Sequence, residues 1–310
     1  MWTLGVDIGA TKTEWMLFDA SGAWVLHHRE ATAALAPNQW LAWLRQCVAP
    51  ALLHGSRLRI GIAFPGVLSK QGLLRASNLP LLDGQLTLDM LQQALAFDVT
   101  VGNDCRLAGW AEARLGAGRG VDKVLHLRLG TGLGGGFCLG GQLYSGHQGV
   151  ACEVGHQGMA SAWLAQQQLP LWRCGCGQLG CVEQYVSGRG LLQLYQHAAH
   201  LPTMPELMQW QLAFAAAEPA ALKAWQQLWD GLGWVIAGQQ LAFDAELVVL
   251  SGGVVAAGID LDAVQQACRR ALFSGVEVPT IRLAQLANSS CYGAALLAGA
   301  VFNDPSARSA

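Results

Sequence analysis

Short apolar runs alternate with tight turns at the start of the chain. The runs cover Trp2–Asp7, Glu14–Phe18 and Trp24–Glu30, and they are separated by Gly-Ala-Thr-Lys and by Ala-Ser-Gly. This pattern is typical of antiparallel strands joined by hairpin turns. We therefore predict that the chain begins with two successive hairpins.

After these hairpins the pattern changes to strands that alternate with helices. Helical spacing of apolar residues, continuous apolar runs and the cap residue Thr87 predict the next elements. They are a helix over Asn38–Leu53, a strand over Leu58–Ala63, a helix over Leu88–Ala96, a strand over Val99–Val101 and a helix over Asp104–Leu115. Together with the hairpins they form a first α/β lobe over residues 1–115.

The glycine-rich stretch Gly116–Gly120 is the best candidate for an internal linker. After it, a strand, a glycine-rich turn and a strand occur in the same order as at the start of the chain. The expected elements are strands over Val124–Leu129, Leu247–Leu250 and Thr280–Leu283, a hairpin about Gly140-Gly141, and helices over Gly190–His200, Ala220–Phe243 and Asp260–Phe273. We predict a second lobe over residues 116–290 and a last helix over residues 291–303 that packs on the first lobe.

Composition limits the classes of protein that this chain can belong to. Of its 310 residues, 52% are hydrophobic and 13% are charged, which excludes disorder as the main state and favours two lobes. The formal net charge is −2 and no segment concentrates Lys and Arg, so the footprint of a nucleic-acid binder is absent from the sequence. A small, uncharged ligand fits this composition better.

The chain also lacks targeting and membrane signals. No basic stretch precedes Asp7, so the N-terminal residues do not have the pattern of a secretory signal. The longest apolar segment, Gly231–Phe243, is too short to span a bilayer. Nine cysteines, an odd number in a chain of this length, argue against a disulfide framework. We expect a cytoplasmic protein that does not act at a membrane.

The first hairpin turn is a candidate phosphate site. In Asp7-Ile8-Gly9-Ala10-Thr11-Lys12, the backbone N–H groups and the Thr11 hydroxyl can face a phosphate, and Asp7 can hold Mg²⁺ through water. An ordinary hairpin turn would have the same sequence, and both interpretations remain open here. The spacing of a Walker A motif is absent.

A second glycine-rich turn covers Gly130–Gly136 and contains the pattern G-x-G-x-x-G. A dinucleotide-binding turn is followed directly by a helix, whereas a hairpin is expected here. Five glycines in seven residues allow the backbone to approach a phosphate closely. We therefore favour phosphate contact over a purely structural turn, with Gly130, Thr131, Gly132, Gly134 and Gly135 as the candidate residues.

The pair Asn103-Asp104 lies between a predicted strand and a predicted helix. A carboxylate at such an edge can be aimed into a cleft, where it can act as a general base. An acid at a helix N-terminus is also an ordinary cap, and this simpler interpretation is favoured for the pair taken alone.

The clearest local signal is a set of metal-ligating residues: His156, Cys174, Cys176 and Cys181. Three thiolates and one imidazole suit tetrahedral Zn²⁺, and four protein ligands make such a site structural. Buried free thiols are the alternative. Glu153 and Glu183 lie close to this set in the sequence. They can serve as partners for sugar hydroxyls, or they can face solvent or support the metal ligands.

Taken together, these motifs resemble the ROK family of sugar kinases, which has the two-lobed, actin-like and hexokinase-type ATPase fold, related to ribonuclease H. The resemblance covers nearly the whole chain. It rests on the first turn, Pro65-Gly66, Asn103-Asp104, Gly130–Gly136, Glu153-Val154-Gly155-His156, Cys174-x-Cys176-Gly177-x-x-Gly180-Cys181-x-Glu183 and Ser251-Gly252-Gly253. Within the family the sequence is most similar to bacterial N-acetylglucosamine kinases.

The resemblance implies phosphorylation of the 6-hydroxyl of N-acetylglucosamine by ATP and Mg²⁺, with a structural Zn²⁺. Asp104 would be the general base. The resemblance further implies sugar binding by Gly66, Asn78, Asn103, Glu153, His156 and Glu183, and nucleotide binding by Asp7, Gly9, Thr11, Lys12, the turn at Gly130–Gly136, Gly252 and Gly253. It also implies a homodimer.

Some residues differ from the family's usual pattern, and other functions compete. Ala10 and Ser251 stand where a glycine is usual, which could weaken nucleotide binding, and Gly102 replaces a common acid. The alternatives are a kinase for N-acetylmannosamine, glucose or fructose, and a sugar-binding protein without catalysis. A ROK-type repressor would need a DNA-binding helix-turn-helix before the first turn, and this chain begins at that turn.

Overall fold

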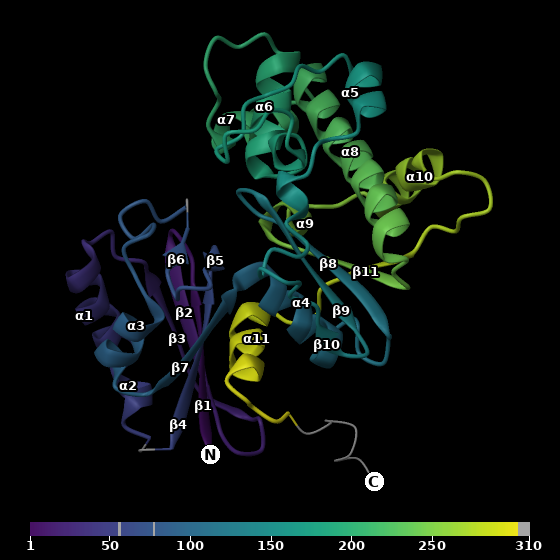
Figure 1. Cartoon of the computed structure of the whole chain (residues 1–310). Helices are drawn as coiled ribbons and strands as arrows, with labels where there is room; N and C mark the ends of the chain where they lie inside the picture. Colours follow the sequence, from purple (N-terminus) through teal and green to yellow (C-terminus); the bar gives the residue numbers. More distant parts are fainter. Residues whose placement is uncertain (55–56, 77, 303–310) are drawn as a thin grey trace. The chain divides into compact units, whose positions relative to one another are not determined.

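The computed structural model describes residues 1–54, 57–76 and 78–302, and these form two compact units (Figure 1). Unit 1 consists of Met1–Gly120, Gly136–Ala151 and the C-terminal residues from Gln285. Unit 2 consists of Val121–Gly135 and Cys152–Ala284. Residue 303, the last residue of the predicted C-terminal helix, lies outside the described part of the chain.

Unit 1 is built on a mixed five-stranded sheet with the order β3-β2-β1-β4-β7. Its strands are β1 (Trp2–Ile8), β2 (Lys12–Phe18), β3 (Trp24–Ala31), β4 (Leu58–Phe64) and β7 (Asp98–Asn103). The first three strands are antiparallel, as the hairpin pattern predicts, and β4 and β7 continue the sheet in parallel with β1.

Helices cover this sheet, and one of them differs from the prediction. They are α1 (Pro37–Cys47), α2 (Ala49–Leu52), α3 (Leu88–Leu95), α4 (Asp104–Leu115) and α11 (Ser289–Leu297), with a small hairpin of β5 (Val67–Leu68) and β6 (Leu74–Arg75). The single helix predicted over Asn38–Leu53 is wrong, because the helix is interrupted at Val48. Pro50 has no N–H to donate and its ring would clash with the preceding turn, whereas the first turn of α2 tolerates it.

The last helix, α11, packs on the sheet of unit 1 and ends at Leu297, before the predicted end at residue 303. Figure 1 shows α11 beside this sheet, and two glycines explain the close approach. A Cβ on Gly5 of β1 would lie 2.0 Å from the carbonyl oxygen of Cys291, and one on Gly61 of β4 would lie 1.8 Å from that of Ala294. The helix backbone therefore rests directly on the strands.

A buried carboxylate links α4 to the segment that leads into α11. Glu112 is fully buried and accepts hydrogen bonds from the N–H groups of Ala117 (2.9 Å), Gln285 (3.1 Å) and Leu286 (2.7 Å). Because a buried charge is tolerated only when it is hydrogen-bonded, these donors make the carboxylate a structural element of unit 1.

We expect Glu112→Gln to lower the free energy of unfolding by about 2 kcal/mol, because hydrogen bonds to a charged group are lost and an amide N–H₂ must face backbone donors. Urea denaturation measures the change. Glu277→Gln, which changes an exposed glutamate, is the matched control. Equal midpoints for the two variants would contradict the structural role of Glu112.

The second sheet has the order β10-β9-β8-β11-β12. Its strands are β8 (Lys123–Leu129), β9 (Leu133–Leu139), β10 (Gln142–Leu143), β11 (Leu247–Ser251) and β12 (Thr280–Leu283). Strands β8, β11 and β12 are parallel, and β9 and β10 form the hairpin predicted about Gly140-Gly141, which both have positive φ (59° and 69°).

The helices of unit 2 include several that the sequence pattern did not predict. The helical elements of unit 2 are the 3-10 turns η1 (Val154–His156) and η2 (Val182–Gln184), and the helices α5 (Ser161–Gln167), α6 (Gly188–Ala198), α7 (Leu207–Ala215), α8 (Pro219–Phe243), α9 (Gly253–Ala256) and α10 (Leu261–Ala271). The helices α6, α8 and α10 agree with the predicted ones to within a few residues.

Residues 136–151 belong to unit 1, whereas the sequence assigned them to the second lobe. Side chains of α4 explain this. The Trp110 indole donates to the carbonyl of Gly141 at 3.1 Å, and the Arg106 guanidinium donates to that of Ala151 at 3.2 Å. These bonds attach the β9–β10 turn and the last residue of the segment to α4.

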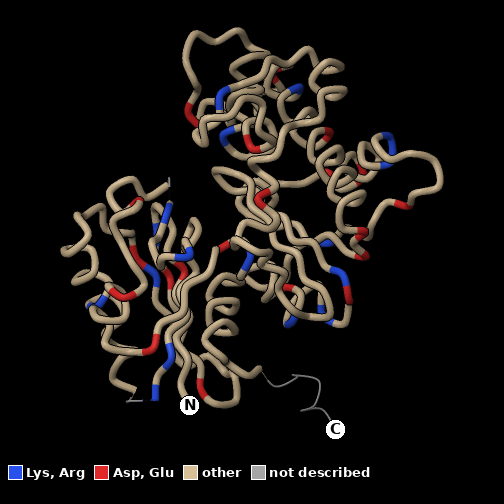
Figure 2. Tube along the Cα trace, viewed as in Figure 1, with Lys and Arg blue, Asp and Glu red and all other residues tan. Residues whose placement is uncertain are grey.

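Charged residues are spread along the whole described chain, with acidic and basic positions interspersed in each unit (Figure 2). Within the described residues, none of the helices combines the length and the apolar character that crossing a bilayer requires.

Candidate functional site

In unit 1 the candidate residues gather at one edge of the sheet. Strands β1, β4 and β7 are parallel neighbours, and Asp7 is in register with Ala63, as Phe64 is with Asn103. The carboxyl ends of the three strands therefore meet, and this edge is where open α/β sheets bind ligands. Asp7 is buried there, with 9% of its surface exposed.

Asn103 caps α4, so the capping role that the sequence offered for Asp104 belongs to its neighbour. The side-chain oxygen of Asn103 accepts from the N–H of Arg106 at 3.0 Å, and its amide nitrogen donates to the carbonyl of Gly66 at 3.1 Å. Asp104 is the first residue of the helix and half-buried. The positive end of the helix dipole favours a carboxylate at this position.

Gly66 and Asn78 have different surroundings. A Cβ on Gly66 would lie 1.9 Å from the carbonyl oxygen of Arg75, so the packing of the β5–β6 hairpin requires a glycine here. Asn78 is exposed and follows Ser77, which lies outside the described residues. The need for Gly66 is therefore explained by packing without any sugar contact.

The first glycine turn joins β1 to β2 and is held by Thr32, the residue after β3. The N–H of Gly9 donates to the carbonyl of Lys12 at 2.8 Å, and the Thr32 hydroxyl donates to the carbonyl of Gly9 at 2.7 Å. Ala10 and Thr11, at the tip, are exposed. The turn is a hairpin turn whose tip a ligand can reach.

A buried glutamate that the sequence analysis did not identify lies beside this turn. Glu14 has a side chain only 6% exposed, and its carboxylate lies 3.4 Å from the ammonium of Lys12 and 2.8 Å from Nε2 of His27. The available signal was a charged residue directly before the apolar run of β2, which begins at Trp15. Glu14 orients Lys12 from the side of the sheet.

In unit 2 the second glycine turn is shorter than predicted. Strand β9 begins at Leu133, so Gly134, Gly135 and Gly136 lie in a strand and the prediction of a turn over them is wrong. A Cβ on Gly135 would lie 3.1 Å from the carbonyl oxygen of Cys152 and 3.2 Å from that of His126, so close packing explains this glycine.

The remaining turn, Gly130–Gly132, is held by the start of α6. The N–H groups of Gly188 and Arg189 donate to the carbonyls of Gly130 (2.8 Å) and Thr131 (3.2 Å). Gly252, which precedes α9, has φ of 101°, and a Cβ there would lie 2.2 Å from the carbonyl oxygen of Leu129. Gly253 is exposed. Gly252 therefore lets the backbone after β11 pass directly beside the end of β8.

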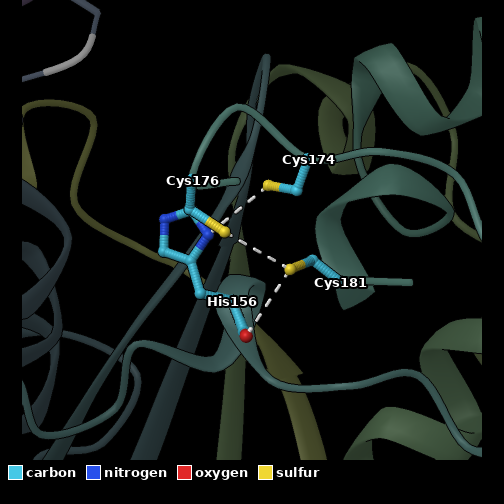
Figure 3. A group of neighbouring side chains, drawn as sticks. All are labelled: His156, Cys174, Cys176 and Cys181. Carbon is cyan, nitrogen blue, oxygen red and sulfur yellow. Dashed lines mark hydrogen bonds between the residues drawn. The ribbon is translucent and has the colours of Figure 1, made fainter. Parts of the chain in front are cut away.

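His156, Cys174, Cys176 and Cys181 converge, as Figure 3 shows. Their four donor atoms lie within 4.8 Å of one another, with Cys174 Sγ 3.7 Å from His156 Nδ1 and Cys176 Sγ 3.6 Å from Cys181 Sγ. A tetrahedral zinc site places two sulfurs about 3.8 Å apart, and sulfur and nitrogen about 3.5 Å apart. The donor set and its spacing fit Zn²⁺.

The thiols of this cluster differ in their acidity. Burial raises the pKa of Cys174 and of Cys181, while the backbone N–H of Gln178 lowers the pKa of the exposed Cys176 thiol. A bound metal would replace the thiol protons, because thiolates are the ligands.

Glu183 connects this cluster to the second glycine turn. One carboxylate oxygen lies 3.0 Å from Cys174 Sγ and 3.8 Å from His156 Nδ1. The other lies 2.6 Å from where a Cβ on Gly132 would stand, so only glycine leaves room for it. Glu153 precedes η1, and η1 ends in His156. Glu183 therefore lies between the cluster and the Gly130–Gly132 turn.

The family model described as ROK matches residues 3–301 of the chain. The chain belongs to the ROK family. This ROK protein is 40% identical to the N-acetylgalactosamine kinase AgaK of Shewanella sp. (strain ANA-3) over 295 residues, which is 94% of this chain and 95% of the relative. It is 35% identical to the N-acetyl-D-glucosamine kinase of Pectobacterium atrosepticum over 256 residues, 81% of this chain and 83% of that kinase.

Solved structures agree with this membership and with the hexokinase-type α/β fold. A ROK family glucokinase from Streptomyces griseus, in complex with glucose and AMPPNP, matches this ROK protein with a TM-score of 0.79 and 29% identity. The match covers 96% of this chain and 99% of that one. A ROK hexokinase from Thermus thermophilus matches with a TM-score of 0.80 and 30% identity, covering 96% and 97% of the two chains.

Proposed function

We propose that the protein transfers the γ-phosphoryl group of ATP to the 6-hydroxyl of an N-acetylhexosamine. The observation that carries this proposal is the match, over most of the chain, to kinases named for N-acetylgalactosamine and N-acetyl-D-glucosamine. The glycine turns and the carboxylate at the start of α4 have the chemistry that phosphoryl transfer needs.

In this proposal the candidate residues have the following roles. Asp104 accepts the proton of the attacking hydroxyl while the new O–P bond forms and ADP leaves. Thr11, Lys12 and the backbone at Gly130–Gly132 hold phosphates. Mg²⁺, bound with ATP, would neutralise charge on the phosphates, with Asp7 as its candidate partner. Further proposed contacts are Gly252 and Gly253 near adenine, and Asn103, Glu153, His156, Glu183, Gly66 and Asn78 at the sugar.

Ser251 is accommodated within unit 2 even though glycine is usual at its position. Its hydroxyl lies 2.8 Å from Nε2 of the buried His126. The extra side-chain atoms are therefore bound within the unit, which favours a working nucleotide site over a sugar-binding protein without catalysis. We also propose a homodimer.

Two amino sugars are candidates for the preferred substrate. The sequence motifs favour N-acetylglucosamine. N-acetylgalactosamine is the second candidate, because the relative named for it is 40% identical over 94% of the chain, against 35% over 81% for a relative named for N-acetyl-D-glucosamine.

A coupled ADP-release assay with Mg-ATP tests the proposal. The panel contains N-acetylglucosamine, N-acetylgalactosamine, N-acetylmannosamine, glucosamine, glucose and fructose. We expect the largest kcat/KM for one of the first two sugars. Preference for glucose or fructose would contradict the substrate class and keep the reaction, whereas no turnover with any sugar would favour a non-catalytic binding protein.

We expect Glu14→Gln to raise the KM for ATP a few-fold, because Lys12 then loses the carboxylate that orients it. The effect is small since Lys12 is 38% exposed and water screens the pair. Steady-state kinetics with each substrate varied in turn measures it. An unchanged KM for ATP with a raised KM for the sugar would contradict this role of Glu14.

A further inference from the structure

A second group of metal-ligating side chains lies in unit 1, at the outer edge of its sheet. The donor atoms of His28, Glu30 and Cys47 lie within 4.8 Å of one another, and Nε2 of His28 is 3.8 Å from a carboxylate oxygen of Glu30. His28 and Glu30 are two residues apart on the edge strand β3, so they share one face of it. Cys47 is the last residue of α1.

A buried tryptophan fixes this arrangement. Trp15 of β2 is directly opposite His28 in the sheet, and their rings lie 5.6 Å apart. The Trp15 indole donates to the carbonyl of Cys47 at 3.1 Å, and Trp15 is 2% exposed. The end of α1 is therefore held against the strand that carries the other two donors, without any contribution from a metal.

The three donors suit a particular class of cation. A thiolate, an imidazole and a carboxylate are the ligand types of Zn²⁺, and three protein ligands leave a fourth position for water. The side chains of His28 and Glu30 are 46% and 35% exposed, while Cys47 is 8% exposed. A cation could therefore enter from solvent, in contrast to the four-ligand Cys₃His cluster of unit 2.

The alternative to a bound cation is a hydrogen bond between the same side chains. Burial and the nearby Glu30 carboxylate, which accepts a hydrogen bond from the thiol, raise the pKa of Cys47 to about 12. The thiol proton then lies where a cation would lie. A borderline cation with a high affinity for sulfur can replace this proton, whereas Mg²⁺, which prefers oxygen ligands, cannot do so effectively.

We propose that His28, Glu30 and Cys47 form a second divalent-cation site, of the zinc class, that ties the end of α1 to the edge strand β3. This site is separate from the Cys₃His cluster and from the residues proposed for phosphoryl transfer. Its occupancy stabilises unit 1, because a cation that binds only the folded state shifts the folding equilibrium.

Zinc stoichiometry tests the site directly. The full-length protein and its His28→Ala variant are dialysed against the same buffered free Zn²⁺, and bound zinc is measured per chain. We expect the variant to hold one zinc fewer, since one ligand of three is removed. His27→Ala is the matched control, because His27 is the neighbouring histidine on the opposite face of β3 and should leave the count unchanged.

Thermal unfolding with and without Zn²⁺ distinguishes the loss of a bound cation from a general loss of stability. Zn²⁺ should raise the Tm of the parent protein more than that of His28→Ala or Glu30→Gln, while Mg²⁺ should raise none of them through this site. Cys47→Ser should show the same loss as His28→Ala. Equal zinc counts for the parent and His28→Ala, or equal losses for His27→Ala and His28→Ala, would overturn the proposal whatever metal the Cys₃His cluster holds.

Discussion

Replacing Asp104 by Asn is expected to lower kcat by about 10² or more and to leave the affinity for the sugar largely unchanged. The amide is nearly isosteric with the carboxylate but cannot accept the proton of the attacking hydroxyl. The fold at this point should survive the change, because the cap of α4 is the side chain of Asn103 and not that of Asp104. The loss should therefore appear in turnover.

Steady-state kinetics and sugar binding by calorimetry, measured on the same sample, test this prediction. Asp89→Asn is the matched control, since Asp89 is an exposed aspartate in the first turn of α3, another helix of unit 1. It should retain the parent's kcat. Normal turnover in Asp104→Asn would remove Asp104 from the role of general base, and equal losses in both variants would point to a general effect of helix termini.

The sequence predicted the elements whose signals are local. The helix over Asp104–Leu115 has the predicted bounds, and Thr87 caps α3 through a bond from the N–H of Met90 at 3.2 Å. Period-two and continuous apolar runs located the central strands because half or all of each strand is buried. In these places the preference of each short segment agrees with the packing around it.

The prediction was wrong where packing between distant segments decides the structure. A run of glycines looks like a turn, yet Gly135 and Gly136 lie in β9, where a Cβ on Gly136 would meet the backbone of Arg106 at 2.9 Å. No local signal distinguishes a glycine needed for a turn from one needed for a close contact.

The break in the helix at Val48 has a local cause and was predictable from the sequence. Pro50 signals it, but the prediction gave more weight to the helical spacing of the apolar residues.

For the candidate site, the sequence identified residues but not how their side chains are used. The pattern singled out Asn103, yet only the structure shows that both ends of its amide are engaged, with Arg106 and with Gly66. Glu14 was missed because His27, its partner on β3, comes close to it only when β2 and β3 pair. Contacts between strands depend on register, which a single sequence does not give directly.

Loss of the Cys₃His cluster is expected to raise the KM for the sugar about tenfold or more, while the KM for ATP changes little. Of the proposed sugar ligands, His156 belongs to this cluster and Glu183 contacts it; they lie 3.7 Å and 3.0 Å from Cys174 Sγ. Without a metal, no shared ion would hold these side chains together, and thermal motion would separate them. The sugar-binding groups would then have to be ordered by the substrate itself, which weakens binding.

Cys176→Ser tests this prediction, because Cys176 is the exposed cysteine of the cluster and its replacement should disturb the core least. The variant should lose about one zinc per chain, as a single four-ligand site requires. Cys268→Ser, which changes a buried thiol of α10, is the control and should keep both its zinc and its sugar KM. Zinc loss with an unchanged sugar KM would show that β-strand and helix packing alone hold His156 and Glu183. Sugar binding would then be independent of the metal, and the cluster would serve only the stability of unit 2.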